Sequence, residues 1–266
     1  MNGYRAGVLA LLSLTAVGAP AAPFVLPPES SIPEGPTGEA IKRGRALITD
    51  TRAQLPANVG NELNCSSCHL NGGTVPYASP YVGLTGLFPE YRARSGRVIS
   101  LQQRINACFM RSLNGQPLAF DSDDMNAILA YISWLSRGVP SGQPVEGRGF
   151  IPLDTALEPD PVRGGQVYVE QCVSCHGTDG KGQTTADGGY LYPPVWGDNS
   201  FNLGAGMARH YTAAAFIRHN MPLGKSGTLT AQQALDVAYY ITHQPRPDFP
   251  ARVRDWPKGG RPKDAR

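Results

Sequence analysis

Apolar residues recur at helical spacing in two parts of the chain, and each stripe follows residues that commonly cap helices. The first stripe, after residues 121–123, comprises Met125, Ile128, Leu129, Ile132 and Leu135. The second, after Thr230, comprises Ala234, Leu235, Ala238 and Ile241. A further helical segment begins each unit, near residues 37–51 and 163–168. The pattern predicts one helical unit that occurs twice, with each stripe facing a core.

Glycine and proline interrupt the chain in two places where no periodicity is present. Residues 137–161 carry nine of them, and residues 244–266 carry five prolines. Such stretches favour extended connections over regular elements. We therefore expect an all-α protein with a first domain at 36–140, a linker at 141–161, a second domain at 162–245, and a tail at 246–266 that lies over the surface or frays.

Composition and charge exclude several classes of protein. Hydrophobic residues make up 41% of the 266 residues, charged residues 17%, and the net charge is +3, which fits a globular chain and argues against a nucleic-acid partner. No apolar run reaches the ~18 to 20 residues that span a bilayer. Residues 1–21 predict a cleaved signal peptide, with Arg5, an apolar stretch and an Ala19-Pro20-Ala21 cleavage site. The apolar stretch is too short for an uncleaved membrane anchor.

Four of the five cysteines lie in two C-x-x-C-H motifs. These are Cys65-Ser66-Ser67-Cys68-His69 and Cys172-Val173-Ser174-Cys175-His176. In this motif both thiols add to the vinyl groups of haem and the histidine binds the iron. A zinc site is the alternative, but a structural zinc site needs a second ligand pair. The motifs predict two covalently attached haem c groups in two class I cytochrome c-like domains, and an exported chain with such groups belongs in the periplasm.

The sixth ligand of the second iron is predicted to be Met221. It lies 45 residues after His176 and directly before Pro222, ahead of the closing helix. Met207 is the rival, because the glycines before it give a flexible approach. His219 is close enough in sequence to compete, but we interpret it as a solvent-facing or propionate-facing group.

The first iron has a different candidate, because Cys108 occupies the corresponding place 39 residues after His69. An inert buried thiol is the alternative interpretation, and Met110 is the fallback ligand. Met125 belongs to the first apolar stripe and is predicted to be core. Thiolate ligation lowers the reduction potential of a haem and thioether ligation raises it. Electrons would then enter at the first haem and leave at the second.

The charge around Cys108 is concentrated in one segment. Residues 91–111 contain no Asp or Glu and five arginines, which are Arg92, Arg94, Arg97, Arg104 and Arg111. A solvated face or a set of haem-propionate partners would account for some of them. Guanidinium groups bind small oxyanions through two oxygens at once. Together with a thiolate, the cluster indicates a sulfur oxyanion as substrate.

These residues resemble the dihaem thiosulfate dehydrogenases. The resemblance spans residues 36–260 and rests on both haem motifs, on Met221-Pro222, and on the segment Arg104-x-Asn106-x-Cys108-Phe109-x-Arg111-Ser112-x-Asn114-Gly115. It implies an active-site haem with His69 and Cys108 as ligands and an electron-transfer haem with His176 and Met221. Some members carry a ligating lysine before the methionine, and Asn220 excludes that ligand here.

The resemblance also implies a reaction. Two thiosulfates couple to tetrathionate at the first haem, held by Arg94, Arg104 and Ser112, and the electrons pass to a periplasmic acceptor such as a small cytochrome c or a high-potential iron-sulfur protein. Cys108 either stays on the iron or forms a sulfur adduct with the first thiosulfate. The same residues serve the reverse reaction, tetrathionate reduction. The alternatives are an electron-transfer cytochrome without substrate chemistry and a dihaem peroxidase, which needs an iron open to peroxide.

Overall fold

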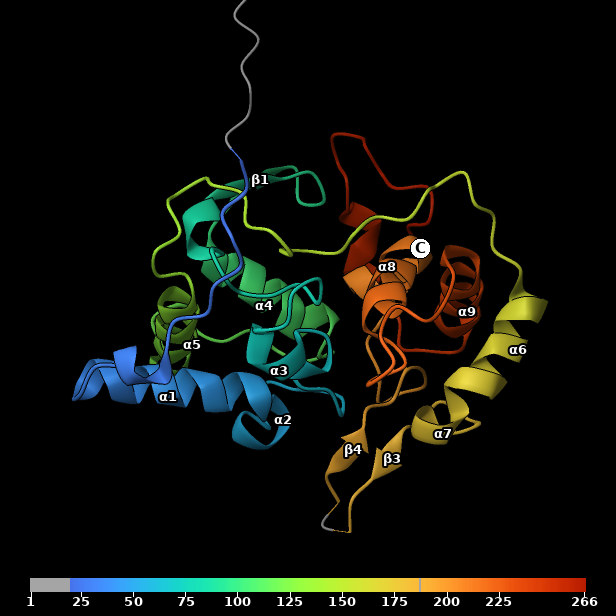
Figure 1. Ribbon diagram of the computed structural model, residues 1–266, viewed down its shortest axis with the longest axis horizontal. Coiled ribbons are helices and arrows are strands. Elements are labelled where there is room, and N and C mark those ends of the chain that lie inside the picture. Colours follow the sequence, from blue (N-terminus) through green and yellow to red (C-terminus); the bar gives the residue numbers. More distant parts are fainter. Residues whose placement is uncertain (1–19, 187) are drawn as a thin grey trace, which may run out of the picture.

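Two pairs of crossing helices form the framework of the computed structural model, which describes residues 20–186 and 188–266. In the first lobe α1 (Pro36–Thr49) packs on α5 (Asp123–Leu135), and in the second α6 (Pro161–Gln171) packs on α9 (Ala231–His243) (Figure 1). The predicted all-α fold with two repeated units is confirmed. The predicted signal peptide lies outside the described residues except for its last two positions.

A glycine stands where each pair of helices crosses. A Cβ on Gly44 of α1 would lie 2.0 Å from the carbonyl oxygen of Ala127, and one on Gly164 of α6 would lie 2.1 Å from that of Asp236. The absence of a side chain therefore lets the two backbones of each pair touch. The two lobes share this contact although their sequences around the glycines differ.

Further helical elements complete the first lobe; η1 precedes α1, and the others lie between α1 and α5 in the sequence. They are η1 (Glu29–Ser31), α2 (Thr51–Gln54), η2 (Cys65–Ser67), α3 (Leu70–Gly73), η3 (Thr85–Leu87) and α4 (Leu101–Arg111). Strands β1 (Glu90–Arg92) and β2 (Arg97–Ile99) pair as an antiparallel hairpin before α4. Helix α4 begins at a capping box in which Ser100 and Gln103 each bond the other's backbone N–H. The hairpin and this cap fix the entry to the helix that carries Cys108.

The second lobe has a similar arrangement. Its elements besides α6 and α9 are α7 (Val173–His176), β3 (Gln183–Thr184), β4 (Tyr190–Tyr192), η4 (Gly206–Ala208), α8 (His210–Asn220) and, in the tail, η5 (Pro250–Arg254). Helix α9 also begins at a capping box, formed by Thr230 and Gln233. Both predicted closing helices are confirmed. In the described part of the chain no helix is long and apolar enough to cross a bilayer.

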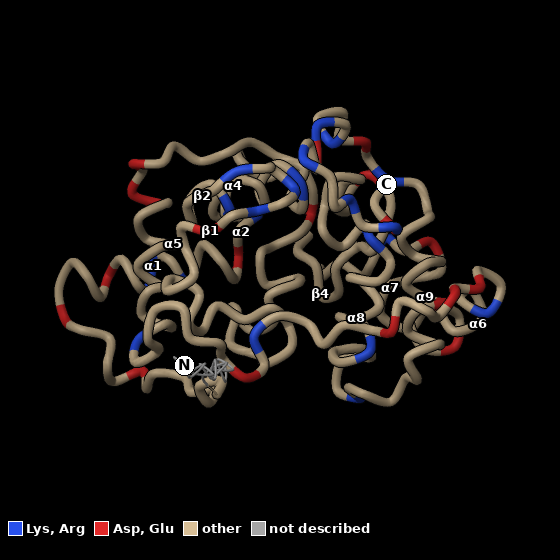
Figure 2. Tube along the Cα trace, turned by 90° about the horizontal axis from the view of Figure 1, so that it is seen from above, with Lys and Arg blue, Asp and Glu red and all other residues tan. Residues whose placement is uncertain are grey.

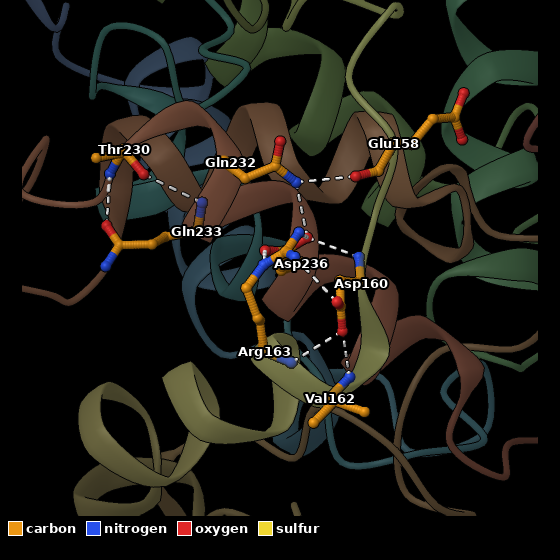
Figure 3. A network of polar contacts seen from close by, with 8 residues as sticks. All are labelled: Glu158, Asp160, Val162, Arg163, Thr230, Gln232, Gln233 and Asp236. Atoms are coloured by element: carbon orange, nitrogen blue, oxygen red, sulfur yellow. Dashed lines mark hydrogen bonds and ion pairs between the residues drawn. The ribbon is translucent and has the colours of Figure 1, made fainter.

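A buried carboxylate joins α6 to α9 (Figure 3). Asp236 is 1% exposed and accepts hydrogen bonds from the Asp160 N–H, the Arg163 guanidinium and the Gln232 amide. Asp160 in turn caps the start of α6 by accepting from the N–H groups of Val162 and Arg163. Because every partner of Asp236 comes from the helix pair or its cap, the network fixes how the two helices meet.

The two cores interlock. The first cluster of buried apolar residues includes Phe201, Ala205 and Ala208, which follow the second haem motif in sequence. Asn202 holds this segment in place, because its amide donates to the Met110 carbonyl at 2.9 Å and to Asn114 Oδ1 at 3.0 Å. The second unit therefore contributes part of the core of the first.

The connections between and after the lobes are packed. In the linker the carbonyls of Gly147 and Gly149 accept from the N–H groups of Tyr77 and Ser79. The tail does not fray: the Asp255 side chain is 6% exposed and is bound to two arginines of the first lobe. Figure 1 shows the tail (red) returning between the lobes. Both segments therefore tie the lobes together.

Candidate active site

The two motif histidines are held in the same way. His69 Nδ1 lies 2.6 Å from the Ser79 carbonyl oxygen, and His176 Nδ1 lies 2.9 Å from that of Pro193. Each contact requires the proton on Nδ1, which leaves the lone pair of Nε2 free for an iron atom. The Tyr81 ring stacks on His69 with the centroids 4.6 Å apart. This orientation suits a proximal haem ligand in both domains.

The motif cysteines are free thiols in apolar surroundings. Burial raises the pKa of Cys65 to about 11, and it raises the pKa values of Cys68 and Cys172 to about 12. Cys65, Cys68 and Cys172 therefore stay neutral, and each motif has an imidazole with a free Nε2. This donor set fits haem c, with Cys65, Cys68 and His69 holding one group and the second motif holding the other.

A cavity of about 530 Å³ lies in the first lobe where it meets the linker and the second lobe. Cys65, Cys68 and His69 line one part of its wall, and Arg104, Cys108 and Ser112 of α4 and its end line another. Apolar side chains such as Ile48 and Leu63 line much of the remainder. The structure thus brings together the first haem motif and three of the four predicted substrate-site residues, Arg94 being the exception.

Cys108 lies inside this cavity with an arginine one turn before it on α4. Arg104 Nη1 lies 2.7 Å from Cys108 Sγ. Burial alone would raise the pKa of the Cys108 thiol, but the charge and hydrogen bond of Arg104, with the nearby His69, outweigh it and lower the pKa to about 6. The thiolate charge, as the larger effect, raises the pKa of Arg104 against its own burial. The cavity therefore holds a buried thiolate that faces the proximal histidine.

The five clustered arginines have different surroundings. Arg92 lines the cavity and pairs with Glu90 at 2.9 Å, while Arg97 is exposed on β2. Arg94 does not line the cavity; its Nη1 donates to the Gly204 carbonyl at 2.9 Å and its Nε lies 3.4 Å from Asp255. Arg111 binds both oxygens of Asp255, at 2.7 and 2.8 Å. Figure 2 shows basic residues gathered at α4 and along the C-terminal segment.

The candidate methionines also lie in different surroundings. Met221 follows α8 and packs against the second core, together with Cys172. Met207 lines the cavity of the first lobe and contacts both cores. Met125 is fully buried, as predicted for a core residue.

His219 and Met110 complete the set of predicted ligand candidates. The ring of His219 lies 5.8 Å from that of Tyr77. Its Nε2 is buried without a hydrogen-bond partner among the described residues. Met110 is not among the residues that line the cavity.

Sequence reasoning missed three residues around the site. Arg209 lines the cavity from the second lobe, Asp255 binds two of the clustered arginines, and Asn202 anchors the segment between them. Each is isolated in sequence from the motifs, so no spacing pattern indicated it.

Comparisons with known proteins agree with this geometry. A family model described as SoxA/TsdA, cytochrome c domain, matches residues 55–141, and one described as Cytochrome c matches residues 161–245. The thiosulfate dehydrogenase of Psychrobacter arcticus is 49% identical over 95% of this chain and 76% of its own length. That of Allochromatium vinosum is 50% identical over 86% of this chain and 87% of its own length.

A solved structure is similar as well. Thiosulfate dehydrogenase TsdBA from Marichromatium purpuratum, in its as-isolated form, superposes with a TM-score of 0.81 at 40% identity. The match covers 85% of this chain and 50% of that one, so the chain spans half the length of that structure. With two cytochrome c domains and relatives of this similarity over most of its length, the chain belongs to the thiosulfate dehydrogenase family of dihaem c-type cytochromes, each domain holding one covalently attached haem c.

Proposed function

We propose that this chain is a periplasmic thiosulfate dehydrogenase that joins two thiosulfate ions into tetrathionate. One sulfur–sulfur bond forms between the outer sulfurs, and two electrons are released. The names of the relatives support the substrate. His69 and Cys108 serve as ligands of the first iron, and His176 and Met221 as ligands of the second. The reverse reaction uses the same residues.

The observation that carries the proposal is the buried thiolate of Cys108. It lies near both the proximal histidine and Arg104, within the cavity that also contains the first haem motif. An electron-transfer cytochrome needs no arginine inside its haem cavity, and a peroxidase needs an open iron position. A thiolate with a guanidinium at 2.7 Å suits a site that receives a sulfur anion.

The substrate presents an electrostatic problem that the arginines address. Two dianions about 5 Å apart repel each other by about 13 kcal/mol at an effective dielectric constant of 20. Arg104 contributes a charge inside the cavity, and the Ser112 hydroxyl lines it without a hydrogen bond to any described residue. Arg94 does not line the cavity, but its guanidinium is close enough to interact electrostatically with those of Arg104 and Arg209. Its positive charge therefore adds to theirs. These groups hold the two anions close enough to react.

The haem groups, when bound, supply one-electron chemistry, so that the two electrons leave one at a time. Met221 on the second iron favours the reduced state more than Cys108 does on the first. The direction of electron flow is therefore from the first domain to the second and on to an external acceptor, such as a small cytochrome c or a high-potential iron-sulfur protein.

The variant Cys108→Gly tests this assignment. We expect both haems to remain attached, as measured by pyridine haemochrome content, and thiosulfate-dependent ferricyanide reduction to be lost. Near-infrared and electron paramagnetic resonance spectra of the ferric variant should lose the thiolate-ligated species and keep the thioether-ligated one. The variant Arg97→Gln, on the exposed strand β2, serves as the control. Wild-type turnover in Cys108→Gly would refute the catalytic role of the thiolate.

A further inference from the structure

The cavity of the first domain contains a cation from the second. Arg209 lies between η4 and α8 and lines the same cavity as Arg104 and Cys108. Its neighbours Met207 and Tyr211 line it as well. The wall of the proposed thiosulfate site is therefore built by both domains.

The position of Arg209 is fixed from both sides of the domain boundary. Ala205 and Ala208, just before it, are 1% exposed and belong to the core of the first domain. The Asn61 amide of the first domain donates to the Ser200 carbonyl at 3.1 Å, and the Asn202 amide of the second donates to the Met110 carbonyl. Side chains that line a pocket from a backbone held in this way are preorganised for a ligand.

Charge pairing distinguishes Arg209 from the other arginines that line the cavity. Arg92 has Glu90 at 2.9 Å, and Arg104 has the Cys108 thiolate at 2.7 Å. The Arg209 guanidinium forms no ion pair or hydrogen bond with any residue in 20–186 or 188–266, and its Nε is buried without a partner. A buried N–H donor such as the Arg209 Nε, left without an acceptor, costs free energy unless a ligand supplies one. Arg209 thus provides the uncompensated positive charge of the cavity wall.

We propose that Arg209 binds the sulfonate group of thiosulfate, so that the second domain completes the substrate site of the first. The inference rests on the proposed function of the cavity. A guanidinium donates to two oxygens of a sulfonate at once, and a pair of thiosulfates brings four negative charges to a wall where two of three arginines are already paired. Arg209 is also close enough to Arg94 for the two charges to interact.

Thiosulfate binding to the fully reduced holoprotein tests the proposal, because the reduced haems accept no electrons from the ligand and binding is measured without turnover. Isothermal titration calorimetry of wild type, Arg209→Gln, Arg209→Lys and the control Arg97→Gln gives the dissociation constants. We expect Arg209→Gln to weaken thiosulfate binding about 10- to 100-fold, Arg209→Lys to recover part of the loss, and Arg97→Gln to match wild type.

A redox titration of both haems in the same variants separates substrate from haem carboxylate as the partner of Arg209. The proposal requires weaker binding with both reduction potentials unchanged. Unchanged affinity in Arg209→Gln overturns it, and so does a shifted potential of the first haem, which would assign Arg209 to a propionate. If wild type itself binds no thiosulfate, the proposed function fails; if wild type and Arg209→Gln bind alike, only the role of Arg209 fails.

Discussion

A single backbone carbonyl holds each motif histidine, and this bond has a chemical consequence. The acceptor is Ser79 for His69 and Pro193 for His176. A hydrogen bond at Nδ1 fixes the tautomer and ring orientation and increases the basicity of Nε2. The two domains use the same device with acceptors at different distances along the chain. Differences between the two haems therefore arise on the opposite side, where Cys108 and Met221 are the proposed ligands.

Arg104 is the residue whose loss should affect turnover most without disturbing the fold. The Arg104 charge lies 2.7 Å from Cys108 and stabilises both the thiolate and an incoming anion. Replacing Arg104 with Gln removes this charge. We expect kcat/KM for thiosulfate to fall about 100-fold, with two haems retained per chain. Steady-state ferricyanide assays measure the change, and Arg97→Gln again provides the comparison. Full activity in Arg104→Gln would show that the cavity arginine takes no part in the reaction.

The sequence predicts which residues form covalent bonds to haem better than it predicts which side chains form ion pairs with one another. C-x-x-C-H spacing is required by the haem bond itself, so both motifs are visible without a structure. The arginine cluster predicts an anion site, yet Arg94 and Arg111 are bound to Asp255, 144 residues beyond Arg111. Pairings at such separations leave no local pattern. Arg209 was missed for the same reason.

At the level of elements, the feature that the two domains share is a crossing of two helices. In both lobes a long helix with a central glycine lies against the closing helix, and the backbone contact leaves no room for a methyl group. At the second crossing, the buried Asp236 also joins the two helices through hydrogen bonds (Figure 3). The stability of the second crossing thus depends on contact between backbones as well as on apolar burial.

Gly164→Ala should destabilise the second domain, and its neighbour provides a matched control. A Cβ at position 164 would lie 2.1 Å from the Asp236 carbonyl oxygen, whereas one at position 165 would lie 3.4 Å from the Tyr240 ring. We expect Gly164→Ala to lower the free energy of unfolding by about 2–3 kcal/mol, because the helices must separate. Gly165→Ala should leave it unchanged or raise it by up to about 1 kcal/mol through helix propensity.

Guanidinium unfolding of the holoprotein, followed by Soret absorbance, measures both changes. Equal stability of the two glycine variants would mean that α6 and α9 do not touch at Gly164.

Periodicity predicted the long helices because each buries one apolar face. The stripes at 125–135 and 234–241 became α5 and α9 with nearly the same bounds. Nothing in the pattern predicted the β1–β2 hairpin, whose three-residue strands are too short for an alternation to be recognised. The placement of residues 201–208 in the first core was equally invisible, since apolar residues show burial but not the partner against which they pack.

Three segments that contact the first domain hold the two domains together. Residues 201–208 enter the first core from the second unit, the linker bonds to Tyr77 and Ser79, and the tail returns to Arg94 and Arg111. Two cytochrome domains on a flexible linker would sample many separations. A fixed relative position suits electron transfer between two haems and allows a site made by both domains. The proline-rich tail was expected to lie over the surface or fray, because composition does not show that Asp255 meets two arginines of the first domain.

Asp255→Asn tests how far the tail holds the domains together. Arg94 and Arg111 would lose a shared carboxylate that is 6% exposed. Burial and the charge of Arg111 lower the pKa of Arg94 to about 10, against the opposing effect of Asp255. Without Asp255 two buried cations remain close together, so we expect the free energy of unfolding to fall by about 3 kcal/mol and the tail to become sensitive to limited proteolysis.

Two further variants separate ion pairing from general damage to the tail. Asp248→Asn removes an exposed pair with Arg252 in the same segment and should change stability by less than about 0.5 kcal/mol. Adding Arg94→Gln to Asp255→Asn should restore part of the loss, because it removes one of the two unneutralised charges. If all three proteins resist protease and denaturant like the wild type, Asp255 does not join the domains, and the packing of residues 201–208 alone must fix their relative position.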